Sequence, residues 1–153
     1  MELIVLMGLQ AAGKTSFFRA RFAATHVHVS KDNFPNARRP AERQEREVEA
    51  ALSSGRSAVV DNTNPTREDR LALIALARRH QAKVVGYYFQ SDLDGCLRRN
   101  AQREGKRCVP EVTLFDTSKR LVLPSPEEGF DALFYVTLVA GGEFEVSPWK
   151  ADA

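Results

Sequence analysis

The feature that most restricts the fold is a short apolar segment that ends at a glycine. Residues 2–7 read ELIVLM, and Gly8 follows directly. Because the apolar side chains from Leu3 to Met7 are consecutive, the segment is typical of a strand buried on both faces, as in a parallel sheet. A chain built around such a strand must cover both of its faces with other elements.

Short apolar runs and longer helical patterns alternate along the rest of the chain. Thr66 is a suitable N-cap for one helix, with Asp69 three residues later, and Gly141-Gly142 suits a two-residue primed turn in a hairpin. The alternation predicts an α/β fold with a mostly parallel central sheet and helices on both faces. The predicted strands are Glu2–Met7, His26–Val29, Ser57–Asp61, Ala82–Gln90 and the hairpin pair Phe134–Ala140 and Glu143–Val146, and the predicted helices are Lys14–Ala24, Ala41–Leu52, Thr66–His80, Asp92–Arg103 and Pro110–Leu121.

Length and composition fit one soluble domain. The chain has 153 residues, 43% of them hydrophobic and 27% charged, which is typical of a single globular domain. We therefore predict one domain over residues 1–153, with a frayed tail at about 147–153. The net charge of +2 is too small to indicate nucleic-acid binding. Cys96 and Cys108 form no disulfide framework or zinc pattern, and no segment is long enough to span a membrane, so a cytoplasmic location is expected.

The end of the first strand carries a phosphate-binding motif, at the edge of the sheet where ligands of such folds bind. GLQAAGKT matches G-x-x-x-x-G-K-[ST] at every fixed position. Its glycines allow backbone N–H groups to face phosphate oxygens, while Lys14 can reach the β- and γ-phosphates of ATP and Thr15 can bind Mg²⁺. The alternative is a glycine-rich turn with a solvated lysine. The predicted nucleotide-binding residues are Gly8, Leu9, Gln10, Ala11, Ala12, Gly13, Lys14, Thr15 and Ser16.

Carboxylates follow the second and third strands. Asp32 lies in SKDNF and can accept a proton from an attacking hydroxyl. The alternative is a helix-cap or loop aspartate. Asp61 opens DNTNP and can hold Mg²⁺ or orient Thr15, and Thr63 and Asn64 can position a substrate. The alternative for this segment is turn chemistry, since Asp, Asn and Pro are common in turns.

Basic residues gather in two further segments. The stretch 98–107 (RRNAQREGKR) predicts a lid over the nucleotide at about 97–112, because arginine suits phosphoryl oxygens; a solvated helix end is the alternative. Arg38 and Arg39 can bind a substrate phosphate or simply begin a helix. Arg67 and Arg70 flank the DNTNP loop, and we rank them below Arg38 and Arg39 as ligands of a substrate phosphate. His26 and His28 alternate in a strand without evident acidic partners, so we interpret them as packing or edge residues.

The ordered motifs GLQAAGKT, SKDNF, DNTNP and RRNAQREGKR resemble the P-loop kinase module of polynucleotide 5′-kinases, over roughly residues 2–135. The resemblance implies a P-loop kinase-type three-layer fold, to which the sequence pattern adds the helical lid at about 97–112 and the C-terminal hairpin. It implies that Asp32 is the general base for a 5′-hydroxyl, that Arg103 stabilises the transferring phosphoryl group, and that Arg99 contacts the nucleotide base. It also places Asp61 on the carboxylate that ends the third strand.

The sequence therefore predicts a Mg²⁺- and ATP-dependent phosphotransferase with a hydroxyl acceptor, first of all a DNA or RNA 5′ end. Two other functions stay open. One is a small-molecule kinase that acts on a nucleoside, sugar or antibiotic hydroxyl. The other is a nucleotide-binding ATPase or switch with a protein partner.

Overall fold

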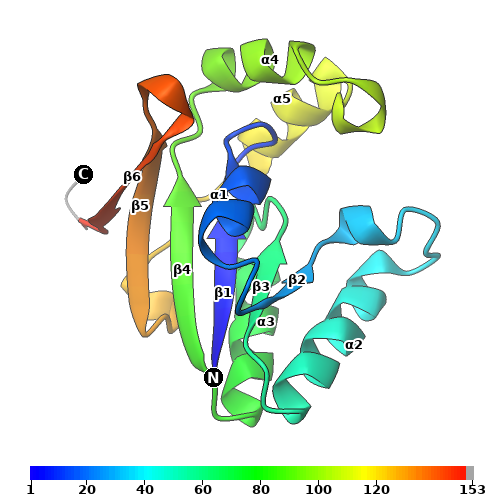
Figure 1. The fold of residues 1–153 in the computed structure, drawn as a ribbon, viewed down its shortest axis with the longest axis vertical. Coiled ribbons are helices and arrows are strands. Elements are labelled where there is room, and N and C mark those ends of the chain that lie inside the picture. The colour runs from blue at the N-terminus through cyan, green and yellow to red at the C-terminus, as the bar shows by residue number, and fades with distance from the viewer. Residues whose placement is uncertain (151–153) are drawn as a thin grey trace.

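The computed structural model describes residues 1–150 and has a single sheet at its centre (Figure 1). The strand order is β2-β3-β1-β4-β5-β6, in which the first five strands run parallel and β6 runs antiparallel to β5. This confirms the predicted α/β fold with a mostly parallel sheet. The strands are β1 (Glu2–Met7), β2 (Val27–Val29), β3 (Ala58–Asp61), β4 (Lys83–Phe89), β5 (Ala132–Leu138) and β6 (Phe144–Pro148).

In residues 1–150, five α-helices cover the two faces of this sheet, as the strand–helix alternation predicted (Figure 1). One hydrophobic cluster joins the sheet to α2 and α3, and a second joins it to α1, α4 and α5. The carboxyl ends of β1, β3 and β4 point toward α4 and α5. The helices are α1 (Lys14–Arg21), α2 (Pro40–Ser53), α3 (Arg67–Arg79), α4 (Leu93–Ala101) and α5 (Glu111–Arg120).

Strand β1 lies in the middle of the core because its side chains are apolar on both faces. Leu3, Val5 and Met7 pack in the cluster with α2 and α3, whereas Ile4 and Leu6 pack in the cluster with α1, α4 and α5. All five are at most 1% exposed. Each such side chain stabilises the fold by roughly 1.5–3 kcal/mol through burial. The buried strand therefore fixes the position of the glycine loop that follows it at the carboxyl edge of the sheet.

Helix α3 begins where the sequence predicted. The Thr66 hydroxyl accepts a hydrogen bond from the Asp69 N–H, and the Asp69 carboxylate accepts from the Thr66 N–H, which completes a capping box. Helix α1 is shorter than predicted and ends at Arg21. The Phe22 N–H closes on the Phe18 carbonyl, and the chain then turns into β2.

The carboxyl-terminal hairpin is present, but two expectations about it are wrong. Its turn has three residues, Ala140–Gly142, because the Val139 N–H bonds the Glu143 carbonyl. Residues 147–149 are not frayed: Ser147 pairs with Tyr135 in β6, and the Trp149 ring packs against Tyr88 and Tyr135. The part of the predicted frayed tail from 151 to 153 lies outside the described residues. Within residues 1–150 we find no helix that is both long and apolar enough to cross a bilayer.

Candidate functional site

The loop after β1 has the backbone that its glycines predict. Gly8 and Gly13 have φ of 141° and 104°, values that favour glycine. A Cβ on Gly8 would lie 3.0 Å from the Phe89 carbonyl oxygen, and one on Gly13 would lie 3.0 Å from the Phe144 ring. Ala11 also has a positive φ, 65°, which is unfavourable for a residue with a side chain. The loop therefore adopts a conformation that ordinary residues resist.

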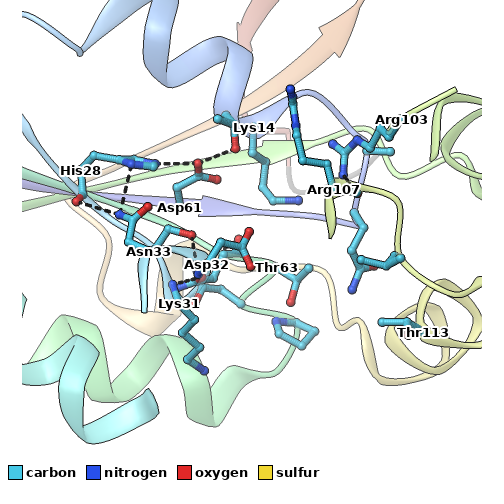
Figure 2. Close-up of a pocket in the computed structure, with 18 of the residues that line it drawn as sticks. Lys14, His28, Lys31, Asp32, Asn33, Asp61, Thr63, Arg103, Arg107 and Thr113 are labelled. Carbon is cyan, nitrogen blue, oxygen red and sulfur yellow. Dashed lines mark hydrogen bonds and ion pairs between the residues drawn. The ribbon is translucent and has the colours of Figure 1, made fainter. Parts of the chain in front are cut away.

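Lys14 is buried beneath this loop at the start of α1. Its Nζ donates hydrogen bonds to the carbonyl oxygens of Gly8 (2.8 Å) and Leu9 (2.5 Å). Burial lowers the pKa of Lys14 to about 8, and the nearby Asp61 carboxylate only partly opposes this effect. Figure 2 shows the lysine reaching into the cavity, with Asp61 on one side and Arg103 on the other. The amine is thus held where an anion would stabilise its charged form.

Asp61 and Thr15 form a pair of oxygen donors next to Lys14. The Thr15 hydroxyl donates to Asp61 Oδ2 at 2.7 Å, and His28 Nε2 lies 2.9 Å from the same oxygen. Burial alone would raise the pKa of Asp61, but hydrogen bonds from His28 and Thr15 and the charge of Lys14 outweigh it and keep the pKa below its usual value. The carboxylate is therefore ionised at neutral pH.

These two oxygens fit a magnesium ion. Mg²⁺ takes oxygen ligands and is usually held by one or two protein groups together with phosphates. Thr15 uses its hydrogen on Asp61, which leaves oxygen lone pairs for a metal, and Asp61 supplies negative charge. Within residues 1–150 we find no group of three or more His, Cys, Asp or Glu side chains that could hold a metal on its own.

Asp32 lies on the loop after β2, in a short 3₁₀ turn over Lys31–Asn33. Ser30 is the cap of this turn and accepts from the Asp32 N–H at 3.2 Å, so the helix-cap interpretation of Asp32 does not hold. The Asp32 carboxylate makes no hydrogen bond or ion pair with any described residue, and it lines the cavity. A free carboxylate in this position can accept a proton.

The DNTNP loop is fixed by hydrogen bonds to the glycine loop and to β1. The Thr63 carbonyl accepts from the Gly8 N–H at 3.0 Å, and the Asn64 side-chain amide donates to the Leu6 carbonyl at 2.7 Å. Both residues line the cavity, but the amide nitrogen of Asn64 is already used to attach the loop to β1. The Thr63 hydroxyl makes no hydrogen bond with any described residue, so of the two side chains it is the one that could contact a bound molecule.

Arg70 anchors the same loop from below, a role that the sequence did not predict. Its guanidinium is fully buried, pairs with Glu128 at 2.7 Å, and donates to the carbonyls of Asn64 (3.2 Å) and Pro65 (3.3 Å). Glu128 also accepts from the Ser125 N–H at 2.8 Å. The pair therefore connects the DNTNP loop to the segment before β5, through two residues that are 58 positions apart in the chain.

One cavity of about 580 Å³ collects these groups. Of the predicted nucleotide-binding residues of the glycine loop, Gln10, Ala11, Lys14 and Thr15 line it. Gly8, Leu9, Ala12, Gly13 and Ser16 do not, and Ser16 is exposed to solvent. Asp32, Asp61, Thr63, Asn64 and Arg103 line it as well. The cavity also contains residues that we did not predict, namely Arg19, His28, Lys31, Asn33, Asn62, Asp69, Arg107, Val109, Thr113 and Arg120.

The predicted lid segment lies beside the loop, with Arg103 and Arg107 toward the cavity (Figure 2). Burial and the neighbouring Arg107 lower the pKa of Arg103. The Asn100 side chain, which the sequence did not single out, fixes the segment: its Nδ2 donates to the Val109 carbonyl at 2.8 Å and its Oδ1 accepts from the Val109 N–H at 3.0 Å. Arg103 and Arg107 therefore lie in a segment whose two ends are held together by the Asn100–Val109 hydrogen bonds.

Three predicted contact residues lie outside the cavity. Arg99 Nε donates to the Ala11 carbonyl at 2.7 Å, so its guanidinium supports the glycine loop from α4. Arg38 and Arg39 are exposed on the chain that leads into α2, and Arg39 lies 3.5 Å from Glu42. None of the three lines the space that holds Lys14 and Asp32. Their predicted contacts with a ligand would need this arrangement to change.

The two histidines differ from their predicted role as partnerless packing residues. His26 Nε2 lies 2.7 Å from Glu2 Oε2, and His28 Nε2 lies 2.9 Å from Asp61 Oδ2. Both carboxylates are remote in sequence, on β1 and at the end of β3, which is why the local pattern did not reveal them. His28 therefore belongs to the site.

The profile of the AAA_33 family, described as an AAA domain, matches residues 3–122 of this sequence. The chain belongs to this family. The match covers the glycine loop, both carboxylate loops, the lid segment and α5. It therefore includes every element that lines the cavity of this AAA_33 domain.

Two curated relatives align with most of this AAA_33 chain. Both carry names that describe a bifunctional polynucleotide phosphatase/kinase, one from Acanthamoeba polyphaga mimivirus and one from Schizosaccharomyces pombe. They are 30% and 26% identical to it, over 89% and 84% of its residues. The alignments cover 33% and 32% of the relatives, so the chain spans about a third of their length.

Solved structures resemble this AAA_33 domain along most of its length. Kti12 from Chaetomium thermophilum, in complex with ADP-AlF3, has a TM-score of 0.70 at 16% identity and covers 88% of each chain. A gluconokinase from Sinorhizobium meliloti 1021 has a TM-score of 0.63 at 21% identity and covers 89% of this chain and 82% of its own. These likenesses confirm the P-loop kinase-type fold.

Proposed function

We propose that this protein transfers the γ-phosphate of ATP to a hydroxyl group with Mg²⁺ bound, and that its acceptor is a polynucleotide 5′ end. The observation that carries the proposal is that one cavity is lined by part of a glycine loop with its buried lysine, by an oxygen pair that suits Mg²⁺, and by a carboxylate that has no hydrogen-bond or ion-pair partner among the described residues. Phosphoryl transfer depends mainly on positioning and charge stabilisation, and these are the groups that it uses.

Each residue has a part that follows from its place in the cavity. The glycine loop and Lys14 would bind the β- and γ-phosphates, and Arg103 would approach the transferring group from the lid side. Thr15 and Asp61 would hold Mg²⁺, which supplies positive charge against the phosphates when it is bound. Asp32 would orient the acceptor hydroxyl and take its proton.

Two observations support a polynucleotide as the acceptor. The curated relatives are named for activity on polynucleotides. The cavity also has more cations than a triphosphate requires: Arg19, Lys31, Arg107 and Arg120 line it in addition to Lys14 and Arg103. An acceptor that carries its own phosphates would use this excess, whereas an uncharged sugar would not.

The test is transfer of label from γ-labelled ATP to a 5′-hydroxyl oligonucleotide in the presence of Mg²⁺. The wild-type protein should label the oligonucleotide, and less efficiently as salt rises, because phosphate contacts release counterions. Label on small metabolites alone would favour the small-molecule kinase. Release of phosphate without any labelled acceptor would favour an ATPase or switch.

Asp32→Asn distinguishes the base from its neighbours. The variant should transfer phosphate at least ~100-fold more slowly, a usual effect of losing a general base, while ATP binding stays within ~3-fold of the wild type because Asp32 touches no part of the glycine loop. Asp116→Asn, an exposed carboxylate on α5, is the matched control and should leave both unchanged. Wild-type turnover in Asp32→Asn would contradict the assignment.

A further inference from the structure

His28 connects the two carboxylate loops of the cavity, and none of the proposed chemistry yet uses it. The ring lines the cavity from β2 and lies 2.9 Å from Asp61 Oδ2, the oxygen that also accepts from Thr15. On the other side of the ring, Nδ1 lies 3.4 Å from Nδ2 of Asn33, the residue that follows Asp32 in the sequence. Figure 2 shows this chain running from Asn33 through His28 to Asp61.

The chemistry of the partners decides which ring nitrogen carries the proton. An ionised carboxylate can only accept hydrogen bonds, so Nε2 must donate to Asp61. In a neutral imidazole the other nitrogen is then an acceptor, and it faces an amide NH₂ group of Asn33, which can only donate. The observed partners are therefore complementary to one tautomer, and each end of the ring has its match.

The ring is also fixed in its plane. It stacks on Phe18 of α1, with 4.2 Å between ring centroids and 30° between planes. Phe18 is three residues after Thr15, so the helix that presents the Thr15 hydroxyl also sets the orientation of the imidazole. Because Asn33 and Phe18 hold the imidazole, its Nε2–H can orient the Asp61 carboxylate without contacting a substrate.

We propose that His28 is a positioning residue that orients the Asp61 carboxylate toward Thr15 and so sets the affinity of the site for Mg²⁺. The inference rests on the proposed function, because it assumes that Thr15 and Asp61 hold the metal. Partners that orient metal ligands change metal affinity or activity by about 10–100-fold when they are removed. His28 would act in this way from β2, and Asn33 would link the same ring to the loop of the general base.

Two substitutions separate the hydrogen bond from the packing. His28→Phe keeps an aromatic ring against Phe18 but has no donor for Asp61. His28→Gln loses the ring but carries an N–H at about the reach of Nε2. The measured quantity is the Mg²⁺ concentration that half-saturates binding of a fluorescent ATP analogue, which needs no turnover.

His26, directly before β2, provides a matched control. It too pairs with a carboxylate, Glu2, and packs on an aromatic residue of the turn after α1, Phe22, with ring centroids 4.9 Å apart. Its partner does not line the cavity. His26→Phe should therefore reproduce any general damage to this edge of the sheet without changing the Mg²⁺ requirement.

We expect His28→Phe to raise the half-saturating Mg²⁺ concentration about 10-fold or more, His28→Gln to recover most of the difference, and His26→Phe to match the wild type. Wild-type Mg²⁺ dependence in His28→Phe, or equal defects in His28→Gln and His28→Phe, would overturn the proposal. So would an equal defect in His26→Phe, because it would indicate a structural effect. A wild-type protein that binds Mg²⁺ and ATP but labels no acceptor would contradict the proposed function and leave this comparison intact.

A second readout uses the protein without nucleotide. Long-range ¹H–¹⁵N spectra of the imidazole rings should show His28 as the Nε2–H tautomer in the wild type, and this signature should be lost in Asp61→Ala. An Nδ1–H tautomer in the wild type would overturn the proposal whatever the binding data show.

Discussion

The buried charge of Lys14 should affect the stability of the fold as well as the binding of ATP. Its pKa falls from an ordinary 10.5 to about 8 because the ammonium is desolvated. A fall of this size corresponds to about 3 kcal/mol of unfavourable free energy for the charged form in the fold, relative to the unfolded chain. The ligand-free protein therefore carries a destabilising charge at neutral pH.

The sign of the pH dependence follows from which state loses its proton first. As pH rises, folded Lys14 is neutralised near pH 8, while the unfolded chain holds its proton until about 10.5. Between these values the unfolded state binds more protons, so stability rises with pH. From pH 7 to pH 9.5 the lysine should add about 2 kcal/mol to the free energy of unfolding.

The assay is urea unfolding of wild type and Lys14→Met at several pH values from 7 to 9.5. The substitution also removes two hydrogen bonds to loop carbonyls, but that loss is constant with pH, so the slope isolates the charge. Staying below pH 10 keeps the buried tyrosines protonated, because burial raises the pKa of Tyr87 and Tyr88. The wild type should gain about 2 kcal/mol relative to the variant across this range.

The control is Lys119→Met, which removes an exposed lysine from α5 and should leave the wild-type slope unchanged. Parallel free-energy profiles for wild type and Lys14→Met would refute the reasoning, because they would mean that burial does not depress the lysine. A wild type that loses stability relative to Lys14→Met as pH rises would refute it more strongly.

Three further predictions concern the same site. A bound polyphosphate would favour the charged form of Lys14, so ATP binding at pH 8 should be accompanied by uptake of a fraction of a proton. Calorimetry in buffers of different ionisation enthalpy measures this uptake, which should be absent in Lys14→Met. Arg70→Met should lower the free energy of unfolding by about 3–5 kcal/mol, because it leaves Glu128 buried without its partner, and Arg70→Met with Glu128→Leu should recover part of that loss in urea unfolding. Ala11→Gly should raise the free energy of unfolding by about 0.5–1 kcal/mol, since a positive φ of 65° disfavours alanine, and a thermal midpoint below that of the wild type would contradict this.

The features that the sequence predicted well are those set by nearby residues. Consecutive apolar side chains identify β1, and Thr66 with Asp69 identifies the start of α3. The glycine loop is predictable for the same reason, because its dihedral angles depend on Gly8 and Gly13 themselves. Because the loop directly follows β1, it must lie at the carboxyl end of a central parallel strand.

The features that the sequence did not reveal are pairings between distant residues. Arg70 meets Glu128 across 58 positions, and His28 meets Asp61 across 33. Nothing in the local pattern of either residue differs from an ordinary surface arginine or strand histidine. Three-residue turns are also hard to distinguish from two-residue turns when both central positions are glycine, as at Gly141 and Gly142.

The unfavourable features of the glycine loop have a common explanation in ligand binding. Lys14 is charged and buried against carbonyl oxygens, and Ala11 is held at a positive φ. Each raises the free energy of the ligand-free fold. The packing of β1 and the hydrogen bonds from Arg99 to the Ala11 carbonyl and from the Gly8 N–H to the Thr63 carbonyl hold the glycine loop in place nonetheless. A bound polyphosphate would stabilise the lysine's charge and accept hydrogen bonds from the strained backbone. Substitutions that relieve these features should therefore stabilise the ligand-free protein and weaken its hold on ATP, whereas strain unrelated to binding would change stability alone.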